Sequence, residues 1–140
     1  MQFDGLEALQ PGLPTIVVGT SAAQYDLHND ADLRDITFDF QESTLRLAWT
    51  LKEAAWRAPE HPKTSQRRTV ASVTLLFSGI RSLRVTGEFA ALAQKREATL
   101  AFLEYSRLAP GIGRVRVVLE TGADLTVVAN GCQLRTTGVA

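Results

Sequence analysis

The stretch "DITFDFQESTLRLAWTLK", residues 35–52, decides the fold class of this chain. Apolar and polar residues alternate in residues 35–40 and again in residues 45–52, and a short polar connection, residues 41–44, joins the two runs. Alternation with a period of two places every second side chain on the same face of a β-sheet. The stretch therefore predicts an antiparallel hairpin, whose buried face is formed by Ile36, Phe38, Phe40, Leu45, Leu47, Trp49 and Leu51.

The opposite face of this hairpin carries charges of both signs. The acids are Asp35 and Asp39, and the bases are Arg46 and Lys52. Opposite charges that face each other on neighbouring strands stabilise a sheet modestly. We therefore expect the two acids to lie near the two bases.

Charge is unevenly distributed along the chain, although the formal net charge is zero. Residues 1–42 carry eight acids and one base, whereas residues 43–96 carry ten bases and three acids. The two segments either pair in adjacent strands or form surface patches of opposite sign, one of which contacts a partner. The isoelectric point is about 6.7 and no aromatic residues are interleaved with the basic cluster, so we expect no nucleic-acid partner.

Further apolar runs indicate that most of the chain is rich in strands. Residues 70–77 and 80–86 flank Ser78-Gly79, which predicts a bend or bulge within one long strand, or a tight pair of strands. Additional strands are expected at residues 15–18, 99–107, 114–119, 125–129 and 132–136.

A turn, a helix and the number of strands complete the predicted architecture. Asn130-Gly131 predicts a hairpin turn, because both residues accept positive φ. Apolar residues at i, i+3 and i+4 in residues 88–97 predict one short amphipathic helix. No internal repeat is evident. About seven to nine strands with one short helix favour an antiparallel sandwich or a partly open barrel.

Length and composition predict a single domain, residues 1–140, that needs no disulfide or metal to fold. Residues 1–14 are expected to form an N-terminal arm, and the polar residues 58–68 a mobile loop. Cys132 is the one cysteine, which favours a reducing compartment. The chain shows no secretory signal and no apolar run near the ~20 residues that span a bilayer, so we expect a cytoplasmic protein without membrane contact.

An acidic stretch before the hairpin is the best candidate for a metal site. Its potential ligands alternate along the chain and are Asp26, His28, Asp30 and Asp32. The spacing is similar to the start of a calcium loop, but the glycine needed at the sixth position and the acid at the twelfth are replaced by Ala31 and Thr37. The alternative is that Asn29 or Asp30 caps a helical turn at residues 31–33. We predict no bound metal or cofactor.

Catalytic residues are not evident either. Nucleophilic catalysis needs a histidine held as a base, and the chain contains only His28 and His61, the latter in the expected mobile loop. The G-x-S-x-G motif is absent, and Cys132 in the last strand is expected to be a small core residue. The sequence therefore favours a protein that is not an enzyme, with a metal-dependent enzyme built on the acidic stretch as an alternative.

Two segments carry a resemblance to known proteins. They are "YDLHNDADL", residues 25–33, which runs into "ITFD", and "VTLLFSGI", residues 73–80, which is followed by "LRV". In this order they resemble small bacterial β-rich proteins of unknown function, including predicted immunity proteins of polymorphic toxin systems. Those families have an "HDA-x-L" start, from which this chain departs by one inserted residue, and an "F-x-G-V-x-x-L" strand pair. The resemblance implies a non-enzymatic protein that blocks a partner through charge and shape complementarity.

Two kinds of binding site follow from these observations. A protein partner would contact a charged face that includes Asp26, Asp30, Asp32, Trp56, Arg67 and Arg68. Alternatively, a small molecule would occupy a pocket between the sheets lined by Phe38, Trp49, Phe77 and Phe102. Self-association is a further expectation, because a sandwich has edge strands that must be covered or paired.

Overall fold

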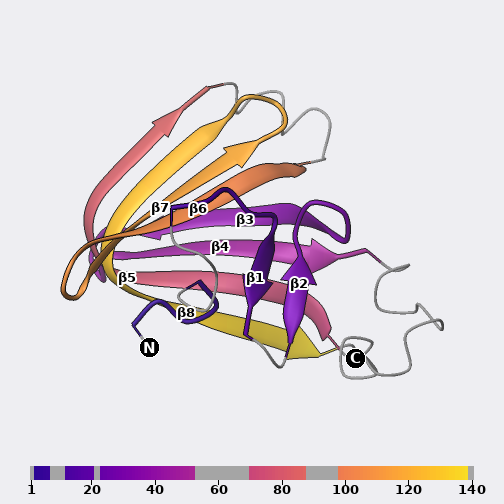
Figure 1. The fold of residues 1–140 in the computed structure, drawn as a ribbon, viewed down its shortest axis with the longest axis horizontal. Helices are drawn as coiled ribbons and strands as arrows, with labels where there is room; N and C mark the ends of the chain where they lie inside the picture. Colours follow the sequence, from indigo (N-terminus) through magenta and orange to yellow (C-terminus); the bar gives the residue numbers. More distant parts are fainter. Residues whose placement is uncertain (1, 7–11, 21–22, 53–69, 88–97, 139–140) are drawn as a thin grey trace.

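The structure, a computed structural model, describes residues 2–6, 12–20, 23–52, 70–87 and 98–138. This part of the chain is all-β, with eight strands in two antiparallel sheets, which confirms the predicted fold class (Figure 1). The predicted helix at residues 88–97 and the predicted loop at residues 58–68 lie outside the described residues. The strands are β1 (Val17–Gly19), β2 (Gln24–Asp26), β3 (Ala31–Asp39), β4 (Thr44–Leu51), β5 (Val70–Thr86), β6 (Leu100–Ala109), β7 (Ile112–Leu119) and β8 (Asp124–Gly138).

The large sheet has the strand order β3-β4-β5-β8-β7-β6. From either edge, a hairpin (β3–β4 or β6–β7) is followed by a long central strand (β5 or β8). The long strands β5 and β8 pair antiparallel at the centre and join the two halves. Residues 73–80 (VTLLFSGI) and 125–132 (LTVVANGC) occupy equivalent places, since Ile80 pairs with Ala129 and Phe77 with Cys132. The two halves therefore share a pairing geometry about the centre of the sheet, although their sequences show no repeat.

The two central strands bend together where Gly79 faces Asn130. Gly79 has a φ of +62°, and the pairing of β5 with β8 shifts between Ile80 and Ser82. The structure thus selects one long kinked strand over two short ones. The predicted hairpin turn at Asn130-Gly131 is wrong, because β8 continues through both residues while paired with β5. Beyond the bend the strands enter a second layer, which lies above the first in Figure 1.

The core lies between these two layers. β4 alternates as predicted, with Leu45, Leu47 and Trp49 fully buried, and its hairpin with β3 is confirmed. From β5 and the second half of the chain come Val73, Leu75, Phe77, Leu103, Val115, Val127 and Ala129. The small β1–β2 hairpin contributes Val18 and Tyr25 to the same core.

The second half of β3 departs from the prediction. Ile36, Phe38 and Phe40 are 39%, 45% and 85% exposed, respectively, although all three were expected to be buried. The reason is the strand order, since β3 is an edge strand whose residues 35–39 pair only with β4 among the described residues. Phe40 belongs to the turn that follows the strand.

The N-terminal residues complete the edge of β8. Gln2 and Asp4 make backbone hydrogen bonds with Cys132, at 2.6 and 2.9 Å. The Phe3 ring packs 5.1 Å from the Tyr105 ring, and both Phe3 and Leu6 are buried. The described part of the expected N-terminal arm therefore contributes side chains to the core.

Candidate interaction surface

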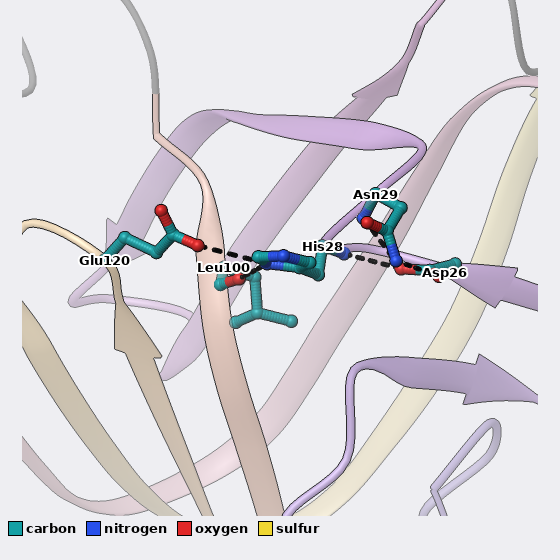
Figure 2. A network of polar contacts seen from close by, with 5 residues as sticks. All are labelled: Asp26, His28, Asn29, Leu100 and Glu120. Carbon is teal, nitrogen blue, oxygen red and sulfur yellow. Dashed lines mark hydrogen bonds and ion pairs between the residues drawn. The ribbon is translucent and has the colours of Figure 1, made fainter.

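The acidic stretch forms a turn that is capped by Asp26. Its Oδ1 accepts hydrogen bonds from the backbone N–H groups of His28 and Asn29 at 3.0 and 2.8 Å, and its Oδ2 accepts one from Asn29 Nδ2 at 2.8 Å (Figure 2). Burial opposes ionisation, but the hydrogen bonds from Asn29 and His28 outweigh it and lower the pKa of Asp26. The expected cap at Asn29 or Asp30 is thus wrong, because residues 31–33 begin a strand.

His28 connects this turn to the far edge of the sheet. Its Nδ1 lies 2.6 Å from the Leu100 carbonyl oxygen and 3.4 Å from Glu120 Oε1 (Figure 2). A carbonyl only accepts, so Nδ1 carries a proton in this contact. Nearby, the Leu33 N–H donates to the Ala98 carbonyl at 3.0 Å. These contacts fasten edge strand β3 to the start of edge strand β6, so the polar atoms of His28 at this site serve the fold.

The four acidic-stretch residues do not gather around one point. The Asp30 carbonyl accepts a hydrogen bond from the Lys52 N–H at 2.7 Å, while the Asp32 carboxylate lies 3.8 Å from Arg34 Nη2. Within the described ranges, no group of three or more His, Cys, Asp or Glu side chains is placed to hold a metal ion. The alternating acidic residues of the sequence therefore do not form a set of metal ligands in the described structure.

The outer face of the β3–β4 hairpin carries one of the predicted charge pairs. Arg46 Nη2 and Nε each lie 2.9 Å from Asp35 Oδ2, which confirms that pair. Asp39 Oδ1 instead accepts hydrogen bonds from the backbone N–H groups of Gln41 and Glu42 in the turn, at 3.1 Å each. Lys52 lies at the other end of the hairpin, because Ala31 pairs with Leu51. The expected pairing of Asp39 and Lys52 with opposite charges across the hairpin is therefore wrong.

Exposed apolar side chains gather at the end of β3. We call Ile36, Phe38 and Phe40 the β3 rim. The rings of Phe38 and Phe40 meet edge to face, with centroids 6.4 Å apart. Isolated exposed apolar residues are ordinary, but a cluster on an unpaired strand edge marks an interaction site or an aggregation hazard. Three acids flank the rim, namely Asp35, Asp39 and Glu42.

The four aromatic residues expected to line a pocket lie in different environments. Trp49 and Phe77 are fully buried in the core, and Phe38 belongs to the exposed rim. The Phe102 ring lies beneath the Arg116 guanidinium, at 5.6 Å, on the outer face of the sheet. A register shift between Leu100 and Phe102 accounts for that orientation. The expected common pocket is therefore not formed by these side chains.

Small spaces do exist next to the core. One, lined by apolar side chains of both layers that include Leu33, Leu47 and Leu125, has a volume of about 10 Å³, which is room for about one water molecule. A second space, of about 180 Å³, lies beside the N-terminal residues Gln2 and Phe3 and is partly lined by Arg107. Neither contains the aromatic set that the sequence indicated.

The other predicted positions lie either in the core or outside the described residues. Cys132 is 2% exposed, which confirms a core residue, and burial with the nearby Asp4 charge raises the pKa of its thiol. Trp56, Arg67 and Arg68 lie outside the described residues, so the expected basic part of the partner face is not placed. Among the described residues, no helix is long and apolar enough to cross a membrane. The β3 rim had no separate sequence signal, because its alternation is that of a buried strand.

Comparisons with known proteins identify no family. No family model matches this chain, and no curated protein matches it. Among solved structures, the fold is similar to the crystal structure of an uncharacterized protein from Neisseria gonorrhoeae, at 12% sequence identity and a TM-score of 0.49. The similarity covers 76% of this chain and 90% of that chain.

Proposed function

We propose that this chain is a non-enzymatic binding protein that engages a protein partner through the β3 rim. The observation that carries the proposal is the exposure of three neighbouring apolar side chains on a strand edge that is unpaired among the described residues. Covering such a side chain contributes up to about 1.5–3 kcal/mol. The free edge also offers N–H and C=O groups to an added strand, a common mode of peptide and protein recognition.

The charges around the rim indicate the chemistry of the partner. Residues 31–42 carry four acids and one base, Arg34. A surface with this charge favours a basic partner and accelerates its approach at low ionic strength. The carboxylate of Asp35 is already paired with Arg46, which leaves Asp39 and Glu42 at the turn as the more available acids.

The polar residues of the acidic stretch hold the fold together, which fits a binding role. Asp26 accepts hydrogen bonds from its own turn, and His28 Nδ1 contacts the Leu100 carbonyl and Glu120. Both are thus engaged in holding the β3 hairpin in place. The narrower proposal, which rests on the family resemblance, is an immunity-like protein whose rim covers the active site of a toxin.

The experiment is a comparison of partner capture by matched variants of the full chain. Phe38→Ser and Phe40→Ser remove rim side chains. Leu13→Ser is the control, because Leu13 is 53% exposed but does not belong to the rim. We expect a basic protein retained by the wild type and by Leu13→Ser to be lost by both rim variants. Equal retention by all four proteins would exclude the rim as the contact.

A further inference from the structure

The second half of β5 presents a strand edge of its own. Residues 82–86 pair with β8 on one side, and Arg81 lies in the register shift that precedes them. On the other side β4 ends its pairing at Ser78, so these residues have no strand partner there among the described residues. In Figure 1 this part of β5 is the outermost strand of the upper layer. We call residues 81–86 the β5 edge.

The β5 edge begins beside the turn that carries the β3 rim. The Ile80 N–H donates to the Ser43 carbonyl, and the Ser43 hydroxyl donates to the Ile80 carbonyl, both at 3.2 Å. Phe40 and Glu42 belong to the same turn as Ser43. Of the six large apolar side chains exposed in the described part of the chain, four are on the rim or on the β5 edge. They are Ile36, Phe38, Phe40 and Val85, the last of which is 49% exposed.

Charge distinguishes the two edges. The turn beside the rim carries Asp39 and Glu42, and the β5 edge carries Arg81 and Arg84. Arg81 Nε donates to Asn130 Oδ1 at 2.7 Å, whereas Arg84 is exposed and makes no ion pair within the described ranges. Within one copy, the β5 edge runs away from the turn that contains Ser43. Arg84 lies four residues beyond Ile80, the residue that contacts this turn. An antiparallel strand added to the β5 edge would run back toward the turn.

We propose that the added strand is the β5 edge of a second copy of this chain, so that two copies form a twofold dimer. This inference rests on the proposed binding role of the rim and names the partner. With the axis at Leu83, Ser82 of each copy faces Arg84 of the other, which keeps like charges apart. Val85 of one copy then faces Arg81 of the other, and the pairing ends there because the backbone of Ile80 already bonds Ser43. Arg84 and Val85 thereby approach the turn of the neighbouring molecule that contains Phe40, Glu42 and Ser43.

This arrangement satisfies three features of the surface together. It pairs the backbone of the β5 edge, brings Val85 toward Phe40 of the rim, and gives Arg84 an acidic neighbour. A strand that pairs with itself about a twofold axis also closes the assembly at two copies, so that it does not grow into a filament.

Sedimentation of the full chain over a range of concentrations, combined with a charge swap, tests the dimer. We expect Arg84→Glu and Glu42→Lys each to weaken dimerisation at least about tenfold. The double variant, in which both charges are reversed, should recover most of the loss. Arg114→Glu, which reverses an exposed charge on β7, is the matched control and should leave the dimer unchanged. The thermal midpoint of each monomer checks that folding is intact.

The outcomes separate this inference from the proposed function. A chain that stays monomeric, or a dimer unaffected by Arg84→Glu, overturns the inference. If such a chain still captures a basic protein that Phe40→Ser loses, the proposed function stands without the dimer. A dimer that is weakened by each single reversal and recovered by the double reversal supports the inference.

Discussion

The side chain of Asn130 fills the space into which a side chain at Gly79 would project. A Cβ at Gly79 would lie 2.8 Å from Asn130 Cβ and 2.7 Å from Asn130 Nδ2. Arg81 holds the Asn130 amide through its oxygen, at 2.7 Å. The bend shared by the two central strands is therefore closed to any residue larger than glycine at this position.

Gly79→Ala is expected to lower the free energy of unfolding by roughly 2–4 kcal/mol, since it adds a steric clash to the cost of positive φ. Gly111→Ala is the matched control. Gly111 also has a positive φ, of +74°, but a Cβ there would meet only Gln2, at ordinary contact distance. The control should lose only about 1–2 kcal/mol. Urea unfolding of both variants measures the difference, and equal losses would remove the clash from the explanation.

Gly113→Ala tests how closely the Phe3 ring packs against the backbone of Gly113. A Cβ at Gly113 would lie 2.5 Å from Phe3 Cζ, so the ring must move, at a cost of about 1–3 kcal/mol. In a Phe3→Ala background the ring is absent, and the same substitution should cost little. A double-mutant cycle by denaturant unfolding reports the coupling. Additive losses would show that Phe3 does not pack over Gly113 in solution.

Asp26→Asn is expected to destabilise the protein by about 1 kcal/mol at neutral pH, because the amide is a weaker acceptor for the turn. The native pKa of Asp26 lies below its ordinary value of 3.8, so its charge stabilises the fold above that pH. This contribution should shrink as the pH falls below 3.8 and disappear once it passes the native pKa. Unfolding of both proteins along a pH series measures it, and a constant difference would contradict the lowered pKa.

His28→Ala is expected to loosen the junction between β3 and the start of β6. The variant loses the contacts of Nδ1 with the Leu100 carbonyl and Glu120, at a cost of about 1 kcal/mol. Hydrogen exchange at the Leu33 amide, which donates to the Ala98 carbonyl, should accelerate more than exchange at Leu47 in the interior of the sheet. Equal acceleration at both amides would indicate a global effect instead of a local one.

The alternation of apolar and polar residues predicted where the strands lie. It predicted which side chains are buried for β4, in the middle of the sheet, but not for the second half of β3. Leu45 and Trp49 are buried as expected, because β4 has neighbours on both sides. Phe38 has the same pattern but lies on an edge, and strand order depends on pairings between residues far apart in the sequence. The contact of Asp35 with Arg46 was predictable because the two strands are joined by a short turn.

Long-range pairing explains the clearest failure, and local contacts explain why the acidic stretch forms no ligand set. Asn130-Gly131 has a strong local preference for a turn, yet the pairing of Gly131 with Ser78 keeps the chain in β8. The acids at positions 26, 30 and 32 have a ligand-like spacing, but the backbone of the turn and of β3 directs their bonds to separate partners. At Asn130-Gly131 the tertiary structure thus overrides a short sequence pattern, whereas Asp26 and Asp32 bond to residues within their own turn and strand.

The mirrored strand order also has a consequence for how the chain folds. Each half is a meander in which the β3–β4 and β6–β7 hairpins close over short turns, so these local pairings can form early. The halves are joined by β5 and β8, which can pair only after a long segment of chain has closed into a loop. Until that step is complete, both central strands expose hydrogen-bonding edges and apolar faces. Folding should therefore be slow for a domain of this size, and most prone to aggregation just before the halves meet.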